Sequence, residues 1–581
     1  MRKTILLIFL AIFEVISAQQ NVDKPNIVII MADDMGFDDV SFRGSNQFLT
    51  PNIDALAYSG VILKNLYTPP MCTPSRSALL TGKYPINTGM QHYVIPNDQP
   101  WSLPVNETTM AQIFQQNGYY TSIIGKWHLG FSRKAYTPTL RGFDYHFGYL
   151  GAYIDYFDHT LYNPNKNFSR GHDFRENLDI SKKYTGTYIT DLLTAKAVKI
   201  IDDHNINEKP LFLLLNHLAP HAANDDKPLQ APPDEIEKFS YIKDPERRTY
   251  AAMMSKLDTS VAHIIEALSK KSILNNTIIL FYSDNGGPTV GMHATTASNY
   301  PLRGQKNSPW EGALRSSAAI WSPKFEKLGT VWKQRIYVAD LLPTLAAAAG
   351  IYINESIKLD GVNLWSALKY GYEAVEREIV HNIDDIDNYV SYFKGKWKFI
   401  NGTTEEGIYD SWLGTRPNHD DEIDNRSKDY ENLIRNTTVW HNLYEFNTNN
   451  GKASNITELR LDAEVKCQNT SAIEVITCNP LISPCLFDID EDPCEQNNLY
   501  EQFKNSKIVL ELLERISYFR EHAHEPNNKP ADPLCDPKYY EYEWTWWQDV
   551  QEGNSAVRST SISYIIFIIL LVNYFSIKFL I

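Results

Sequence analysis

The sequence predicts an α/β fold: a mainly parallel sheet covered by helices, followed by a smaller α+β C-terminal domain with a short antiparallel sheet. Three observations predict this fold. Apolar strand-like runs alternate with helical stretches from residue 26 to about residue 350, and the pattern changes after about residue 380. The 581 residues are 43% hydrophobic and 22% charged, which is ordinary for a globular chain and excludes a largely disordered one.

The central strands are expected where apolar runs are bounded by polar residues. Four such runs occupy residues 27–31, 120–124, 211–215 and 278–282. Helices are expected to begin at Thr50-Pro51 and Thr73-Pro74, where a capping hydroxyl precedes a proline at the first helical position. We place the domain that these elements form at residues 19–380.

The C-terminal subdomain is expected over residues 381–552. Runs at 389–393 and 396–400 flank Gly395 and predict a hairpin. Residues 401–470 are polar and rich in asparagine, which predicts surface loops. Apolar residues at helical spacing predict a helix over 506–523.

The N-terminus indicates the secretory pathway. Arg2 and Lys3 precede an apolar run over 5–13 and a small-residue site at Ser17-Ala18, so residues 1–18 are expected to be a cleaved signal peptide. The alternative is a short membrane anchor, but Glu14 and the length of the segment argue against it. Nine N-x-S/T acceptors for glycans agree with secretion: Asn106, Asn167, Asn275, Asn354, Asn401, Asn425, Asn436, Asn455 and Asn469.

The C-terminus resembles a GPI-attachment signal over residues 553–581. A cluster of small residues at 553–556 is followed by a polar spacer and an apolar tail over 564–581. A marginal transmembrane helix is the alternative, since about 20 apolar residues span a bilayer. Both interpretations attach the protein to a membrane and place its body outside the cell or in a lumen, so it is expected to be extracellular or on the cell surface, or else lysosomal.

The charge balance excludes one class of partner. With 55 Lys+Arg against 70 Asp+Glu, the formal net charge is -15. Nucleic-acid binding needs clustered basic residues, so we expect no nucleic-acid partner.

Acidic and amide side chains follow two of the predicted strands. Asp33 and Asp34 come after the run at 27–31, and Asp284 and Asn285 come after the run at 278–282. Ligands bind beyond the carboxyl ends of strands in open α/β sheets, and oxygen donors suit Ca²⁺ or Mg²⁺. Asp-Asn-Gly-Gly by itself is typical of a turn, but the two pairs together favour a metal site.

The segment Cys72-Thr73-Pro74-Ser75-Arg76, continued by Leu80-Thr81-Gly82, carries the strongest signal. It resembles the sulfatase signature, in which a formylglycine-generating enzyme oxidises the cysteine to the catalytic aldehyde, formylglycine. A buried structural cysteine is the alternative. The helix expected at Thr73-Pro74 would direct its N-terminal N–H groups toward an anion beside Cys72.

The resemblance extends over nearly all of the chain between its two ends, and points to the arylsulfatase B (N-acetylgalactosamine-4-sulfatase) type. It is carried further by the strings at 125–130, 141–144, 302–306 and 310–312. It implies an alkaline-phosphatase-like core that carries the site, and a smaller sheet domain after it.

The resemblance also implies roles for single residues. The expected Ca²⁺ ligands are Asp33, Asp34, Asp284, Asn285 and the modified Cys72. The residues expected around the sulfate ester are Arg76, Lys126, His128, His221 and Lys306. His217 is the alternative to His221, because this sequence inserts residues 222–227 before the Pro-Leu pair that closely follows the family's histidine.

The implied mechanism uses a hydrated aldehyde. One of its hydroxyls, activated by the metal, attacks sulfur while Ca²⁺, Lys126 and Lys306 stabilise the sulfate oxygens. His221 protonates the departing alkoxide, and His128 takes the proton of the second hydroxyl so that sulfate is eliminated. A serine or thiol nucleophile lacks that second hydroxyl, which explains why the cysteine is modified.

The cysteines show where this sequence departs from the arylsulfatase B type. Apart from Cys72, five remain, and we expect two disulfides of unresolved pairing and one free thiol among Cys467, Cys478, Cys485, Cys494 and Cys535. The cysteines that the type carries in its first half are missing from segments 96–101 and 159–173. The resemblance assigns these loops to the substrate entrance, so substrate choice should not be inherited with the catalytic core.

Three functions are therefore weighed. The first is a sulfatase acting on a sulfated sugar, which is either a glycosaminoglycan end or a smaller sulfated glycoside. The second is a phosphoester or phosphonate hydrolase of the same superfamily, and the third is a non-catalytic cell-surface binding protein. The third requires a broken site, whereas every motif position is filled here.

Overall fold

The computed structural model describes residues 24–162, 168–374, 376–414, 416, 422–446, 455–467 and 477–552. The predicted signal peptide and the predicted C-terminal anchor lie outside these residues. Within them, no helix combines the length and the apolar character that crossing a bilayer requires.

The four predicted runs form the centre of a ten-stranded sheet with the order β12-β2-β11-β10-β1-β9-β3-β4-β7-β8. They are β1 (Asn26–Asp33), β3 (Tyr120–Lys126), β9 (Leu211–Pro220) and β10 (Thr277–Ser283). Neighbours from β10 to β4 pair in parallel, as predicted. All eight residues of β1 are buried, because layers cover the sheet on both faces.

Antiparallel strands extend this parallel centre. β11 is antiparallel to both β10 and β2, and β7 and β8 form an antiparallel edge beside β4. Their bounds are β2 (Val61–Tyr67), β4 (Tyr145–Tyr149), β7 (Arg175–Glu176), β8 (Asp179–Ile180), β11 (Arg315–Trp321) and β12 (Thr330–Tyr337). β5 (Thr160–Leu161) and β6 (Gly171–His172) form a separate two-stranded ribbon.

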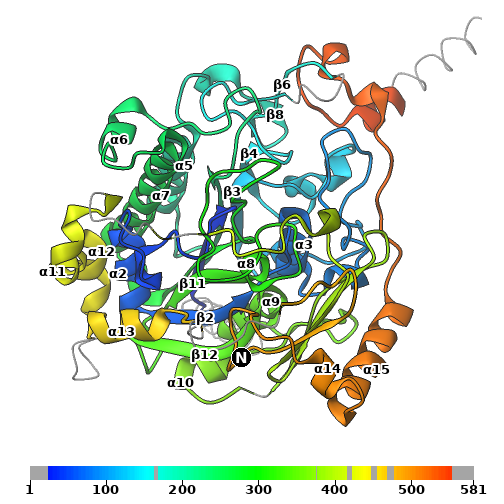
Figure 1. Ribbon diagram of the computed structural model, residues 1–581. Coiled ribbons are helices and arrows are strands. Elements are labelled where there is room, and N and C mark those ends of the chain that lie inside the picture. The colour runs from blue at the N-terminus through cyan, green and yellow to red at the C-terminus, as the bar shows by residue number, and fades with distance from the viewer. Residues whose placement is uncertain are drawn as a thin grey trace, which may run out of the picture.

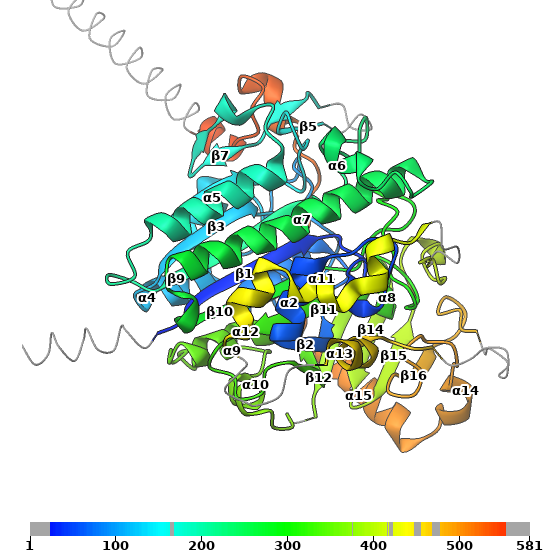
Figure 2. The same cartoon turned by 90° about the vertical axis from the view of Figure 1, so that its left-hand side faces the viewer.

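Helices cover the sheet on both faces (Figures 1 and 2). The long helices α5 (Ile189–Asp203) and α7 (Pro245–Lys270) cross one face together with α2 (Pro51–Ser59). On the other side α3 (Cys72–Thr81) packs with α4 and α9. The remaining helices of this domain are α4 (Met110–Gln116), α6 (Pro233–Glu237), α8 (Glu311–Leu314), α9 (Leu341–Ala348) and α10 (Trp365–Tyr370).

The two predicted helix starts differ in detail from the structure. α2 begins at Pro51 as predicted, but its N-terminus is capped from another helix: Asp258 of α7 accepts hydrogen bonds from the Asn52 and Ile53 amides at 3.0 and 2.8 Å. α3 begins at Cys72 with Met71 as its N-cap, so the predicted start, with Thr73 as cap and Pro74 as first helical residue, is wrong by two residues. The Thr73 hydroxyl instead donates to the His128 carbonyl at 3.1 Å, which ties α3 to the loop after β3.

A four-stranded antiparallel sheet follows, as predicted, with the order β13-β14-β15-β16. Its strands are β13 (Glu378–Asp384), β14 (Tyr389–Lys394), β15 (Trp397–Asn401) and β16 (Cys485–Asp488). Gly395 turns the predicted hairpin with a φ of +62°, which favours glycine. The predicted late helix is α15 (Lys507–His522), capped by the Ser506 hydroxyl, and the short α14 (Tyr500–Phe503) precedes it.

The prediction of loops throughout residues 401–470 is wrong. This region contains α11 (Tyr430–Arg435), α12 (Thr438–Tyr444) and α13 (Ile456–Ala463). α11 and α12 pack on α2, and α12 also contacts α7 (Figure 2). Few apolar residues suffice for this packing: Ile434, Val439, Leu443 and Ile456 are fully buried within an otherwise polar sequence.

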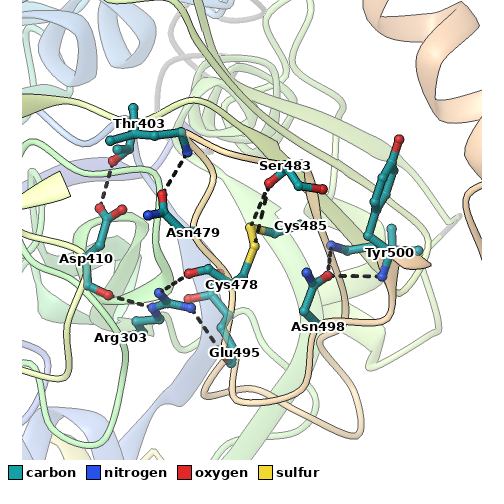
Figure 3. The surroundings of a disulfide bond; sticks show 12 residues. Arg303, Thr403, Asp410, Cys478, Asn479, Ser483, Cys485, Glu495, Asn498 and Tyr500 are labelled. Atoms are coloured by element: carbon teal, nitrogen blue, oxygen red, sulfur yellow. Dashed lines mark hydrogen bonds between the residues drawn. A yellow bond between two sulfur atoms is a disulfide. The ribbon is translucent and has the colours of Figure 1, made fainter. Parts of the chain in front are cut away.

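Two disulfides form in the C-terminal part, as predicted. The one cysteine of the five that stays free is Cys535. The pairs are Cys467–Cys494 and Cys478–Cys485. Figure 3 shows the second bridge beside Arg303, whose guanidinium donates to the Cys478 carbonyl at 2.9 Å and to the Asp410 carbonyl at 2.6 Å.

Seven of the nine predicted glycan acceptors lie in described residues, and all seven are exposed: Asn106, Asn275, Asn354, Asn401, Asn425, Asn436 and Asn455. Asn167 and Asn469 lie outside the described residues.

Candidate active site

Two neighbouring strands bring the predicted metal ligands together. β1 and β10 pair in parallel up to Ala32 and Ser283, so the residues that follow them leave the same edge of the sheet. The Asp34 amide donates to Asp284 Oδ1 at 3.2 Å, and Asn285 Nδ2 donates to Asp34 Oδ1 at 2.6 Å. Asp33, Asp34, Asp284 and Asn285 are all fully buried.

Cys72 is the first residue of α3 and points at this cluster. Its Sγ lies 3.6 Å from Asp33 Oδ1 and 4.0 Å from Asp34 Oδ1. Burial raises the pKa of the Cys72 thiol to about 12, although Lys126 and Lys306 oppose the rise. The unmodified thiol is therefore protonated at neutral pH and is not itself a ready nucleophile.

Three cations surround the carboxylates. Lys126 Nζ lies 2.6 Å from Asp33 Oδ2, and Lys306 Nζ lies 2.6 Å from Asp34 Oδ2. Arg76, one turn along α3 from Cys72, contacts Asp284 Oδ2 at 2.7 Å. Burial by itself would lower the pKa of Lys306, but the neighbouring Asp34 carboxylate raises it above its ordinary value, so the ammonium group stays charged.

The structure distinguishes between the two candidate histidines. His221 Nε2 lies 3.4 Å from both Asp34 Oδ2 and Lys306 Nζ, whereas His217 Nε2 contacts Ser260 Oγ at 2.9 Å, away from the cluster. Burial, reinforced by Lys306 and Lys126, holds the pKa of His221 well below its usual range. Of the two histidines, His221 is the one that lies in the cluster.

His128 completes the predicted set. Its Nε2 contacts the Ile95 carbonyl at 3.1 Å, while its buried Nδ1 has no hydrogen-bond partner in the described part of the chain. Burial lowers the pKa of His128, and the neighbouring Lys126 and Arg76 lower it further, so the ring is neutral and able to accept a proton.

The donor set fits a hard divalent cation such as Ca²⁺. Carboxylate oxygens of Asp33 and Asp34 lie within 4.8 Å of one another and of ligand atoms of Cys72 and His221. Asp284 and Asn285 border this group through their contacts with Asp34, and Asn285 Oδ1 is buried without a hydrogen-bond partner among the described residues. Burial and the nearby Asp33 carboxylate raise the pKa of Asp284, although Arg76 and the two lysines oppose the rise. Asp284 therefore lies where further positive charge is favourable.

A cavity of about 410 Å³ opens above this cluster. Cys72, His128, His221 and Lys306 are at its base, while Asp33, Asp34 and Asp284 lie beneath its lining. Both loops that the resemblance assigned to the substrate entrance contribute to the wall, through Pro96, Asn97 and Asp98 and through Leu161, Phe168 and Ser169.

Several lining residues were not predicted from the sequence. The ring of Tyr153 stacks on His221 with 5.7 Å between centroids, and the ring of His293 lies 4.9 Å from Tyr153. Trp544 comes from the segment after α15, which Figure 1 shows running to the top of the molecule. There the His172 amide donates to the Tyr542 carbonyl at 2.8 Å. These residues carry no local motif, because distant loops bring them together.

Comparison with known proteins decides the family. The sequence model described as Sulfatase matches residues 25–351. The chain belongs to the sulfatase family. The predicted resemblance is confirmed, and with it an alkaline-phosphatase-like core.

Relatives agree with this assignment over most of the sulfatase chain. Arylsulfatase J of Mus musculus is 36% identical over 92% of this chain and 82% of its own length. N-acetylgalactosamine-6-sulfatase of Mus musculus is 30% identical over 61% of this chain and 68% of its own. The crystal structure of Ps i-CgsB is 27% identical, with a TM-score of 0.64, and covers 87% of this chain and 94% of its own. This sulfatase is therefore an enzyme, a sulfuric ester hydrolase.

Proposed function

We propose that this sulfatase removes sulfate from a sulfated sugar or glycoside, with Cys72 converted to formylglycine and Ca²⁺ held by Asp33, Asp34, Asp284 and Asn285. One observation carries the proposal: Cys72 at the base of a cavity, 3.6 Å from Asp33 Oδ1, among buried carboxylates and cations. When present, the aldehyde hydrate and the ion supply the nucleophilic hydroxyl and Lewis-acid activation.

The cations of the chain are placed to bind the sulfate group. Lys126 and Lys306 contact Asp33 and Asp34, the two carboxylates beside Cys72, so they would stabilise the charge that develops on the sulfate oxygens. Their present partners, Asp33 and Asp34, are the residues proposed to bind the metal ion. Ion binding would therefore leave the two ammonium groups available to the sulfate.

The two histidines would transfer protons in two different steps of the reaction. His221 would protonate the departing alkoxide, because a bound sulfate counteracts the effect of Lys306 and Lys126 on its charged form. His128 is neutral and lines the cavity with Cys72, so it would accept the proton of the second hydroxyl.

The names of relatives support a sugar substrate. N-acetylgalactosamine-6-sulfatase is named for a sulfated amino sugar, and Ps i-CgsB was solved in complex with k-i-k-neocarrahexaose. A cavity of about 410 Å³ lies within the range of small-molecule sites.

Steady-state kinetics on the purified protein test this function. We expect kcat/KM to be at least about 100-fold higher for 4-nitrophenyl sulfate than for 4-nitrophenyl phosphate, a difference of about 2.7 kcal/mol in transition-state binding. The reverse preference would support the phosphoester or phosphonate alternative. A panel of sulfated sugars and glycosides would then define the natural substrate.

We further propose that the enzyme matures in the secretory pathway, meets the formylglycine-generating enzyme there and remains attached to the cell surface by a GPI anchor. Two disulfides and seven exposed glycan acceptors support an oxidising route. Release of activity from intact cells by a phosphatidylinositol-specific phospholipase is the expected result, whereas retention would support the spanning alternative.

A further inference from the structure

The cavity wall beyond the sulfate-binding groups is not built for an anion. Among its described residues, Lys306 is the only lysine or arginine, and three carboxylates lie further out: Asp98, Asp225 and Glu405. Lys306 already belongs to the catalytic cluster. The remaining basic side chain, His293, is neutral, because burial and Lys306 lower its pKa to about 4.

Much of the same wall is apolar. It includes the side chains of Met71, Tyr93, Val94, Tyr153, Leu161, Phe168, Met292 and Trp544. Met292 is 60% exposed, which is unusual for a methionine, and its Sδ accepts a hydrogen bond from the Tyr93 hydroxyl at 3.3 Å, so its apolar side chain is held at the cavity wall within reach of a bound molecule. Apolar surface of this kind favours a ligand whose own facing surface is apolar, because no hydrated polar group then has to be buried against the wall.

Two residues of the cavity wall carry a buried N–H donor that has no hydrogen-bond acceptor among the described residues. Asn97 Oδ1 accepts a hydrogen bond from the Ala152 amide at 3.1 Å, and Asn97 Nδ2 is buried and without a hydrogen-bond partner in the described chain. Trp544 Nε1 is likewise buried and has no hydrogen-bond partner in the described chain, and the residue is only 2% exposed. Buried polar groups are normally hydrogen-bonded, so both donors point to a ligand that carries hydroxyl or ether oxygens.

We propose that the substrate carries no charge besides its sulfate group: a monosulfated glycoside of a neutral sugar with an apolar aglycone, not a polyanionic sugar chain. This inference rests on the proposed function. The catalytic cluster binds the sulfate group, the donors Asn97 and Trp544 bind sugar oxygens, and the apolar wall takes the aglycone. A second carboxylate or sulfate would meet Asp225 and Glu405, and the described lining holds no lysine or arginine besides Lys306 to balance it.

A matched pair of substrates tests the charge. The sulfate ester of 7-hydroxycoumarin-4-acetic acid and that of its methyl ester release the same 7-oxycoumarin ring system and differ only in a remote group, a carboxylate in one and its methyl ester in the other. We expect kcat/KM to be at least tenfold higher for the methyl ester, and the ratio to shrink as salt is raised, because salt screens the repulsion. Equal rates would overturn the proposal, whereas no turnover of either compound would count against the proposed function itself.

Variants show whether the wall causes the preference. The double variant Asp225→Asn and Glu405→Gln should reduce the ester-to-acid ratio at least threefold. The matched control, Asp234→Asn and Glu237→Gln, removes the same charge from exposed positions on α6 outside the cavity and should leave the ratio unchanged. An equal change in both double variants would show a general charge effect and would refute the role of the wall.

Competitive inhibition tests the apolar part independently. We expect the inhibition constant of hexyl sulfate to be at least tenfold lower than that of ethyl sulfate, and Met292→Gln to reduce this gain at least twofold. Leu140→Gln, which changes an exposed leucine outside the cavity, is the control and should keep the gain. Inhibition that does not depend on chain length would overturn the assignment of an apolar aglycone.

Discussion

Two residues of the active site adopt a backbone conformation that side chains disfavour. Asp34 has a φ of +64° and His128 a φ of +57°, both in the left-handed region. Such conformations cost about 1–3 kcal/mol and persist where the surroundings impose them. Here they turn the chain sharply after β1 and β3, so that Asp34 and His128 enter the site while their neighbours continue the fold.

Replacing Cys72 tests the proposed nucleophile. Cys72→Ala should abolish turnover while leaving the far-ultraviolet spectrum and the melting temperature nearly unchanged, because an alanine fills most of the same buried space. Cys535→Ala, at the other buried free thiol, is the control and should retain activity. Peptide mass analysis should find an aldehyde at position 72. An intact cysteine there in fully active protein would contradict the mechanism.

Calcium removal tests the acidic cluster. A chelator should abolish activity and lower the melting temperature, and added Ca²⁺ should restore both, since a ligand at 100 times its Kd stabilises the fold by about 2.7 kcal/mol. Asp284→Ala should weaken calcium binding, measured by calorimetry, because it removes one of the converging oxygens. Unchanged calcium affinity in that variant would remove Asp284 from the ligand set.

The smaller antiparallel sheet and the disulfide-bonded loop before its strand β16 hold two loops of the active-site cavity in place. The segment between α3 and α4 carries Tyr93 into the cavity wall, and its neighbour His92 pairs with Asp384 at the end of β13 at 2.9 Å. Asn382 of the same strand donates to the Gln91 carbonyl at 2.9 Å. Arg303 similarly fastens the loop that carries Lys306 to the disulfide-bonded loop in Figure 3.

The His92–Asp384 pair predicts a pH-dependent stability. The hydrogen bond that His92 donates to the Asp384 carboxylate raises the pKa of His92 above its unfolded value of about 6.5. Its stabilisation is therefore complete below about pH 6.5 and is lost as the pH rises through the raised pKa. Denaturant unfolding should show that His92→Gln loses about 1 kcal/mol at pH 5.5–6.5 and little at pH 9.

A control makes this pH prediction specific. His441→Gln changes an exposed histidine on α12 and should leave the pH profile as it is in the unaltered protein. A His92→Gln profile parallel to that of the unaltered protein would show that the pair contributes no pH-dependent stability.

A buried ionic network joins the ten-stranded sheet to the four-stranded sheet. Lys398 of β15 lies 3.0 Å from Glu311 Oε1 and 2.7 Å from Glu495 Oε1, and Arg315 of β11 contacts Glu311 Oε2 at 2.6 Å. The side chains of Lys398, Glu311 and Glu495 are fully buried. Since each charge is balanced by the others, the two domains are expected to unfold together.

Replacing Lys398 tests this connection. Lys398→Met leaves two buried carboxylates with less positive charge, and should lower the free energy of unfolding by about 3–5 kcal/mol. Lys396→Met, two residues away and 47% exposed, removes an ion pair with Asp488 at the surface and should cost less than about 1 kcal/mol. Similar melting temperatures for the two variants would show that the network does not hold the domains together.

The sequence alone was enough to predict the family and the acidic cluster, because that information is contiguous. The apolar runs predicted the four central strands, the residues after two of them predicted the acidic cluster, and the motif at Cys72 predicted the family. Parallel strands end at one edge of a sheet, so local patterns sufficed to bring Asp33, Asp34, Asp284 and Asn285 together.

Only the tertiary structure decided between His221 and His217, paired the cysteines, placed helices within residues 401–470 and assembled the cavity wall. Each of these depends on contacts between segments far apart in the chain, such as Asn97, Met292 and Trp544 around one cavity. Long-range packing leaves no periodic signal in a single sequence. The residues that cluster beside Cys72 were therefore predictable, whereas the residues that line the cavity above them were not.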